Sequence, residues 1–183
     1  MQGSRGEIWH WKDFSDESPY KACSEELLEE GFGKTWALFY PRKFSEKESM
    51  GSIAKFYVAD NGFPTIYGLK DLGYRMENVV AIELLRREHY FNPLLDVYYW
   101  HDRHRDVDFV VTEGFEVRDL IQVCYDVEDL STKKREINAL LKASKEIGCK
   151  NLHIITWDYE GVEEVEGRKV RFTPLWKWLL KAS

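Results

Sequence analysis

Two aspartates separated by one residue begin the segment DVDFVV at residues 106–111. Side chains alternate between the two faces of a strand, so Asp106 and Asp108 are expected on one face. Val107 and Phe109 are expected on the other. Carboxylates that share a face provide the oxygen ligands that Mg²⁺ prefers.

A second segment, IQVCYD at residues 121–126, carries polar side chains at alternate positions. The same alternation places Gln122, Cys124 and Asp126 on one face of a neighbouring strand. The Gln122 carbonyl can coordinate a metal but brings no negative charge. The Cys124 thiol is largely protonated near neutral pH, is too soft a ligand for Mg²⁺ and brings no positive charge. The alternate set, expected in the core, is Ile121, Val123 and Tyr125.

Length and composition predict a folded globular protein. The chain has 183 residues, 44% hydrophobic and 32% charged, which suits one domain or one domain with an appendage. A net charge of −6 argues against general nucleic-acid binding, so any phosphate contact needs a local basic patch. The three cysteines have no close pairing and are expected to be reduced thiols.

The sequence predicts neither a membrane-spanning segment nor an ATP-binding site. No apolar run approaches the roughly 20 residues that span a bilayer, and the N-terminus lacks the apolar core of a signal peptide, so we expect a cytoplasmic protein. The string GFGKT at Gly31–Thr35 ends like a phosphate-binding loop. Leu28 stands where such a loop needs its first glycine, and the string follows a predicted helix, so we expect no ATP binding.

Hydrophobic periodicity predicts an ordered series of elements. In chain order these are a helix at 24–30, a strand at 34–41, a charged loop at 43–52, a strand at 54–60, a helix at 72–88, strands at 97–100, 107–112 and 117–125, a helix ending at Ile147, a strand at 151–157, a hairpin at Glu166 and Gly167, and a short helix opened by Pro174. Ser131 or Thr132 is expected to cap the helix that Gly148 ends. Tight turns make the three central strands an antiparallel meander, and the long helix leads to a parallel fourth strand.

This αβββαβ order, together with the two motifs, is similar to the core of PD-(D/E)XK nucleases, which are restriction-endonuclease-like α/β domains with a mixed sheet. Most of the chain resembles the C-terminal nuclease-like domain of a family of archaeal and bacterial AAA-type ATPases. The segments that carry the resemblance are KFYVADNGF, GYRMENVVAIELLRR, VYYW, DVDFVV, IQVCYD, TKKREINALLKA and NLHIITWD. The resemblance implies a winged-helix-tail-like extension at 1–52 and a nuclease-like domain at 53–183, without the P-loop motor domain.

The resemblance also implies the site residues. Asp108 matches the family's metal-binding acid, and Glu77 matches the helix acid directed at the metal. Gln122 and Cys124 stand where the family has an acid and a lysine. The implied Mg²⁺ ligands are therefore Glu77, Asp108 and Gln122, with Cys124 as the fourth catalytic position. Glu83 is a poorer substitute for Glu77, because it lies well around the helix.

A basic residue displaced from Cys124 can come from the following helix, where Lys133, Lys134 and Arg135 stand. Asp126 can likewise restore the missing carboxylate. The alternative is that the helix charges are solvated surface and that Asp126 only opens the turn before the helix. Lys133 and Arg135 are the candidates for binding nucleic acid.

The polar segment HDRHR at 101–105 is expected in a hairpin turn. His101 and His104 lack the third and fourth ligands of a zinc site. We expect this turn to act as a basic finger, in which Arg103 and Arg105 touch phosphate. The tryptophans, Trp176 and Trp178 among them, are expected in core and C-terminal packing rather than in base stacking.

Two functions compete. One is a Mg²⁺-dependent DNA endonuclease-like domain whose degenerate motif gives weak or no cleavage. The other is a catalytically inactive module that binds nucleic acid or a protein partner and regulates an ATPase-family protein. The sequence leaves enzymatic turnover and homodimer formation open.

Overall fold

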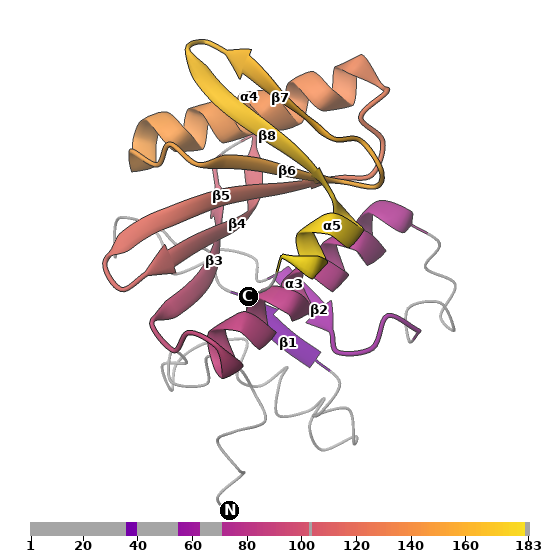
Figure 1. Ribbon diagram of the computed structural model, residues 1–183, viewed down its shortest axis with the longest axis vertical. Coiled ribbons are helices and arrows are strands. Elements are labelled where there is room, and N and C mark those ends of the chain that lie inside the picture. The colour runs from indigo at the N-terminus through magenta and orange to yellow at the C-terminus, as the bar shows by residue number, and fades with distance from the viewer. Residues whose placement is uncertain (1–35, 40–54, 63–70, 103, 182–183) are drawn as a thin grey trace, which may run out of the picture.

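The computed structural model describes residues 36–39, 55–62, 71–102 and 104–181. These residues form an α/β fold with a mixed six-stranded sheet and a separate two-stranded sheet (Figure 1). The elements are β1 (Trp36–Phe39), β2 (Lys55–Val58), α3 (Leu72–Tyr90), β3 (Leu95–His101), β4 (Asp106–Glu113), β5 (Glu116–Cys124), α4 (Leu130–Ile147), β6 (Leu152–Thr156), β7 (Gly161–Val165), β8 (Arg168–Pro174) and α5 (Leu175–Leu180). The helix expected at 24–30 and the loop expected at 43–52 lie outside the described residues.

The strand order of the larger sheet is β3-β4-β5-β6-β8-β7. The first three strands are an antiparallel meander, and β6 pairs in parallel with β5. Both pairings confirm the prediction, because α4 supplies the crossover that parallel strands need. The predicted hairpin at Glu166 and Gly167 joins β7 to β8, and both residues have the positive φ that such a tight turn requires.

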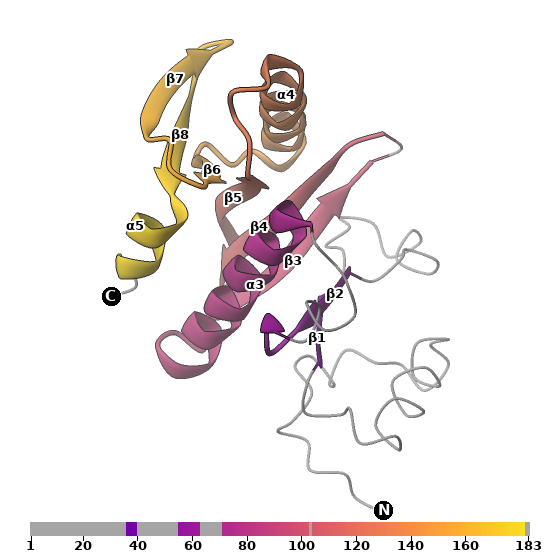
Figure 2. The ribbon, with the colours of Figure 1, turned by 90° about the vertical axis from the view of Figure 1, so that its right-hand side faces the viewer.

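Helices cover both faces of the six-stranded sheet (Figure 2). α4 packs on one face, where its apolar side chains join a core cluster with residues such as Val110, Cys124 and Ile154. α3 and α5 pack on the opposite face in a second cluster that includes Phe109 and Trp178. The face covered by α3 and α5 is called the α3 face below, and the face covered by α4 is called the α4 face. The polar residues of the strands can point to either face.

The ends of α4 follow local chemistry. Asp129, rather than Ser131 or Thr132, is the N-cap, and its Oδ1 accepts the Ser131 N–H at 2.9 Å. The two hydroxyls instead donate to the Asp129 carboxylate, so the expected cap was two or three residues late. Gly148 ends the helix with a φ of 83°, as predicted, because glycine adopts this left-handed conformation without strain.

A β-bulge lies at the start of β4. The register of β3 against β4 shifts between Tyr98 and Trp100, so Asp108 and Phe109 together oppose Tyr99. Phe109 therefore packs in the α3-face cluster, on the side to which Asp108 also points. The expectation that Phe109 lies opposite Asp108 was wrong, because the extra residue breaks the alternation on which it depended.

The smaller sheet joins β1 to β2 in an antiparallel pair, with Trp36 opposite Val58 and Phe39 opposite Lys55. It lies beside α3 and outside the six-stranded sheet (Figure 1). β1 comes from the stretch expected to be an N-terminal extension and β2 from the stretch expected to be nuclease-like. Among the described residues, no helix has the length and apolar character needed to cross a membrane.

Two of the residues expected in the core are on the surface. Trp178 is buried as expected, but Trp176, on the other side of the short helix α5, is 60% exposed. Tyr125 follows the last residue of β5 and is 37% exposed, next to the exposed Trp157 at a ring-centroid distance of 5.6 Å. Trp176 is exposed from within α5, whereas Tyr125 lies beyond the end of β5.

Candidate functional site

Three carboxylates surround one lysine on the α3 face. The Lys55 Nζ donates to Asp108 Oδ1 at 2.7 Å and to Glu77 Oε1 at 3.0 Å. Asp106 Oδ2 lies 3.6 Å from the same nitrogen. Glu77, Asp106 and Asp108, together with Lys55, are called the acid cluster below.

The acid cluster is assembled from three elements. Lys55 begins β2, Glu77 lies in the second turn of α3, and the two aspartates are at the start of β4. The side chain of Asp108 is 7% exposed and those of Lys55 and Glu77 about a fifth, whereas Asp106 is 54% exposed. Solvent therefore reaches the cluster from the side of Asp106.

Asn78 fixes β2 against α3. Its side chain is buried, and it bonds both backbone groups of Val58: Oδ1 accepts the N–H at 2.7 Å and Nδ2 donates to the carbonyl at 2.8 Å. The same Nδ2 also donates to Asn61 Oδ1 at 2.8 Å. The two bonds from Asn78 take the place of those that a neighbouring strand would make with Val58. They hold β2 against α3 and thereby set where Lys55 contacts Glu77.

A buried tyrosine supports Glu77. The Tyr57 hydroxyl donates to Glu77 Oε1 at 2.6 Å, and the Tyr57 ring packs 5.8 Å from that of Phe109. Burial, and then the nearby Glu77 and Asp108 carboxylates, raise the pKa of Tyr57 well above its ordinary value. Tyr57 therefore stays a hydrogen-bond donor that orients Glu77.

The electrostatics of the cluster follow from three carboxylates around one ammonium. Burial, and then the charge of Glu77, raise the pKa of Asp108 to about 7, against the opposing pull of Lys55 and of the Val123 N–H that Asp108 Oδ2 accepts at 2.9 Å. Burial alone would lower the pKa of Lys55, but the Asp108 and Glu77 carboxylates outweigh it and raise that pKa. Lys55 thus stays charged, while the cluster retains excess negative charge that favours a proton or another cation.

Gln122 lies behind Asp108, toward the α4 face. Its Oε1 accepts the backbone N–H of Asp108 at 3.1 Å, and its Nε2 donates to Glu136 Oε2 at 2.7 Å. The Asp108 N–H can only donate, and the Glu136 carboxylate accepts. The orientation of the Gln122 amide is therefore fixed. The Gln122 carbonyl is therefore engaged with the protein backbone.

Cys124 shares the α4 face with Gln122, as the alternation predicted, but this is not the face of the Lys55 ammonium. Its side chain is buried in the α4-face cluster, and Sγ lies 3.3 Å from the carbonyl oxygen of Asp126. Burial, and then the charges of Glu136 and Asp126, raise the pKa of Cys124 to about 11. It is an uncharged packing residue.

The predicted basic residues have partners outside the acid cluster. Lys133 pairs with Glu163 and lies over the rings of Tyr159 and Phe172, and Arg135 pairs with Glu136. Arg105 is exposed in the turn between β3 and β4, where its carbonyl accepts the Asp102 N–H at 2.8 Å. Arg103 lies outside the described residues.

The remaining candidate acids have structural partners. Asp126 Oδ1 accepts the N–H groups of Glu128 and Asp129, so it opens the turn before α4. Glu83 pairs with Arg86 and Arg87 further along α3. Neither acid contacts the acid cluster.

Lys55 and Tyr57 were not among the site residues expected from the sequence. They stand two residues apart in KFYVAD, a spacing that places them on one face of a strand. That signal was present in the sequence. Their proximity to the acids depends on β2 lying against α3, which strand periodicity does not specify.

Comparison with known proteins adds no relative: no protein-family model, curated protein or solved structure matches this chain. Within the part of the chain that the structure describes, no three His, Cys, Asp or Glu side chains are arranged to hold a metal ion. The cation of the acid cluster is the Lys55 ammonium.

Proposed function

We propose that this chain is a PD-(D/E)XK nuclease-like domain that acts on DNA with Mg²⁺, and that Lys55 on β2 provides the positive charge absent at Cys124. The observation that carries the proposal is the Lys55 ammonium, which hydrogen-bonds both Glu77 and Asp108. The order α3, β3–β5, α4, β6 supports it. On this proposal the chain corresponds to the nuclease-like part of an AAA-type ATPase.

The donor set of the cluster fits Mg²⁺ in charge and chemistry. Mg²⁺ is held by carboxylate oxygens and waters, and Glu77, Asp106 and Asp108 each place a carboxylate oxygen within 3.6 Å of the Lys55 ammonium. The Lys55 ammonium shows that a cation is stabilised there. Gln122 does not fit the ligand role first expected of it, because its carbonyl already accepts the Asp108 N–H.

Each residue then has a distinct part in phosphodiester cleavage. Glu77, Asp106 and Asp108 would hold the ion, which would supply Lewis-acid chemistry at a phosphate oxygen and at a water. Lys55 offsets the negative charge that grows on the phosphate. Tyr57 orients Glu77, and the bond from Val123 N–H to Asp108 Oδ2 orients Asp108.

We expect turnover to be weak. Gln122 on β5 stands at the second acidic position of the motif. Because its amide is neutral, the site has one carboxylate fewer than the motif provides. Among the exposed basic residues on or beside β4 and β5, which include Arg105, Arg118 and Arg135, Arg118 is paired with Glu113 and Arg135 with Glu136. Binding to DNA therefore depends on few charges and should be weak, with a shallow dependence on salt.

The test combines cleavage with metal binding. Plasmid and oligonucleotide cleavage with Mg²⁺ or Mn²⁺ is measured for wild type, Asp108→Asn and Lys55→Met, with Lys145→Met as the control lysine. Mn²⁺ binding is followed by electron paramagnetic resonance. We expect cleavage in wild type and in the control, and none in the other two variants. We expect Asp108→Asn to lose Mn²⁺ and Lys55→Met to bind it more tightly, because the ammonium competes for the same carboxylates.

A non-catalytic domain is the second candidate, and it is favoured by the glutamine and the buried thiol at the two motif positions on β5. In that case Lys55 neutralises the acids permanently and holds β2 in place. Absence of both cleavage and Mn²⁺ binding, in wild type and in Lys55→Met, would overturn the nuclease proposal and leave this one.

A further inference from the structure

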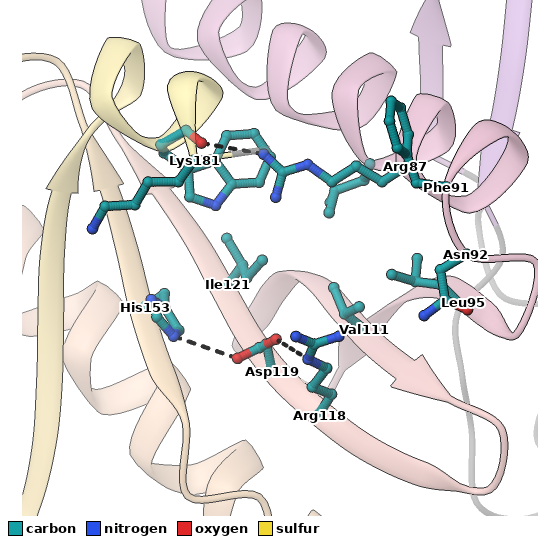
Figure 3. A pocket seen from close by; sticks show the side chains of 12 residues that line it. Arg87, Phe91, Asn92, Leu95, Val111, Arg118, Asp119, Ile121, His153 and Lys181 are labelled. Carbon is teal, nitrogen blue, oxygen red and sulfur yellow. Dashed lines mark hydrogen bonds and ion pairs between the residues drawn. The ribbon is translucent and has the colours of Figure 1, made fainter. Parts of the chain in front are cut away.

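A second candidate site lies at the other end of α3 from the acid cluster. A pocket of about 260 Å³ opens between the C-terminal half of α3, α5 and strands β3–β6 (Figure 3). Pockets for drug-sized ligands run from about 300 to 1,000 Å³, so this one suits a smaller molecule. None of the residues of the acid cluster lines it.

The floor of the pocket is apolar and preformed. Its side chains come from five different elements and are all buried: Leu84, Leu95, Val111, Ile121 and Trp178. Figure 3 shows Val111 and Ile121 rising from the sheet below the Arg87 side chain of α3. Burying hydrocarbon against such a surface is favourable by about 25 cal/mol per Å².

Arg87 forms a rigid upper rim. Its guanidinium stacks on the Trp178 ring at 4.0 Å and donates to the Trp178 carbonyl at 3.2 Å. Its Nε also donates to Glu83 Oε1 at 2.9 Å. Because these contacts hold the side chain in place, a ligand that uses Arg87 would cost little conformational entropy.

The lower rim is a chain of polar side chains. His153 Nε2 lies 3.4 Å from Asp119 Oδ1, and Arg118 Nε lies 3.6 Å from Asp119 Oδ2. Arg118 also pairs with Glu113 at 3.1 Å. The Arg118 side chain is 54% exposed, so it can turn toward a ligand without losing a buried contact.

The lining carries more positive than negative charge. Three cationic side chains, Arg87, Arg118 and Lys181, and one carboxylate, Asp119, line the pocket, and Arg87 is paired with Glu83 and Arg118 with Glu113 and Asp119. The Lys181 ammonium makes no ion pair with any residue that the structure describes, and the acid nearest to the pocket is already engaged by Arg118 and His153. The positive charge at the rim that is left for an anion is therefore that of Lys181, with the exposed Arg118 beside Asp119 as a second donor.

We infer that this pocket binds a small organic acid, with an aromatic or branched hydrocarbon body on the apolar floor and a carboxylate between Arg118 and Lys181. Inorganic phosphate would leave the floor unused, and a neutral hydrocarbon would leave the cationic rim unused. The inference does not depend on the proposed nuclease function, because the two sites share no residue.

The test uses three matched probes: 2-naphthoate, 2-naphthylmethanol and 2-naphthylmethylammonium. Binding is followed by ¹H–¹⁵N correlation spectra of the full chain. We expect shifts at the backbone amides of Val111, Ile121 and Lys181, and the acid should bind at least about 10-fold more tightly than the alcohol, which corresponds to 1.4 kcal/mol. The ammonium probe should bind most weakly.

Variants separate the floor from the rim. Ile121→Trp fills the pocket and should weaken both the acid and the alcohol, whereas Lys181→Gln and Arg118→Gln should weaken only the acid. Lys145→Gln, on α4, is the control and should change neither. Equal affinity for acid and alcohol, shifts confined to other residues, or no shift up to about 10 mM probe would overturn the inference.

Discussion

Gln122 and Glu136 form a buried hydrogen bond of 2.7 Å between the amide Nε2 and the carboxylate Oε2. The bond joins β5 to α4 on the α4 face of the sheet. The other end of the amide accepts the Asp108 N–H, and Arg135 donates to the other oxygen of Glu136. This polar chain connects the acid cluster to the α4 face, and it explains why the motif position on β5 accommodates a glutamine.

Gln122→Glu should therefore destabilise the protein rather than complete the motif. The new carboxylate would face Glu136 in a buried place and would lose the donor that Glu136 now accepts. We expect a loss of about 3 kcal/mol in the free energy of unfolding at pH 7. Urea unfolding followed by circular dichroism measures it.

Exchanging the two groups provides the control. The double variant Gln122→Glu with Glu136→Gln keeps one amide and one carboxylate at the same contact, so it should recover most of the stability lost in the single variant. A double variant as unstable as Gln122→Glu alone would show that charge repulsion at this contact is not the cause.

Lys55→Met should destabilise the protein at pH 7 by about 3 kcal/mol, because it leaves buried carboxylates without their cation. The loss should shrink at pH 5, where the carboxylates take up protons more readily, and in the double variant with Asp108→Asn. Lys145→Met is the matched control: its partner Glu166 is exposed, and we expect a change below about 1 kcal/mol. A pH-independent loss would contradict the electrostatic origin.

Stability should depend on pH through Asp108. Its pKa is raised to about 7 in the folded protein, so the folded state binds this proton more tightly than the unfolded chain does. The contribution to stability is fully present below about pH 4, the ordinary aspartate pKa, and is lost between about pH 4 and pH 7. In urea unfolding with a metal chelator, the advantage of Asp108→Asn over wild type should therefore grow across that window.

Asp129 provides a comparison of opposite sign. Hydrogen bonds from Thr132 and Ser131 lower its pKa to about 2, so its contribution is present above about pH 4 and is lost as the pH falls toward 2. Asp129→Asn should remove the loss of stability at low pH and leave the pH dependence of stability between pH 4 and 7 unchanged. If Asp108→Asn behaves in the same way, the raised Asp108 pKa is wrong.

Asn78→Ala should release β2 from α3. The substitution removes three hydrogen bonds and leaves the Val58 backbone groups without their partner, at a cost of about 2 kcal/mol. Hydrogen exchange should become faster at the Val58 amide and stay unchanged at the centre of α4. Asn138→Ala, at an exposed position of α4, is the control, and an equal effect there would contradict an anchoring role for Asn78.

Much of the six-stranded sheet was predictable from local patterns. The meander, the parallel strand after α4 and the glycine stop at Gly148 follow from turn length, crossover length and backbone freedom, which are properties of short stretches. The faces of Gln122 and Cys124 were also set by alternation. Alternation does not predict which face of the sheet lies against Glu77 and Lys55. The bulge at Asp108 and Phe109 also interrupts the alternation locally.

The acid cluster was predictable only in part. Asp108 and Glu77 were identified from their positions in the motif, and the structure brings them to one lysine. Lys55 was not identified, because its contact with Asp108 joins residues 53 positions apart and depends on tertiary packing of β2. Long-range contacts of this kind depend on side chains such as Asn78, whose role is invisible to periodicity.

Helix α3 carries Glu77 near one end and Arg87 near the other, a separation of about 15 Å along its axis at 1.5 Å per residue. After its first turn the helix contains neither glycine nor proline, so it moves as one body. On the two proposals above, occupancy of the pocket and cation binding at the acid cluster become linked equilibria if either one displaces α3. If an organic acid shifts α3 and changes the cation affinity by some factor, the cation must change the affinity for that acid by the same factor.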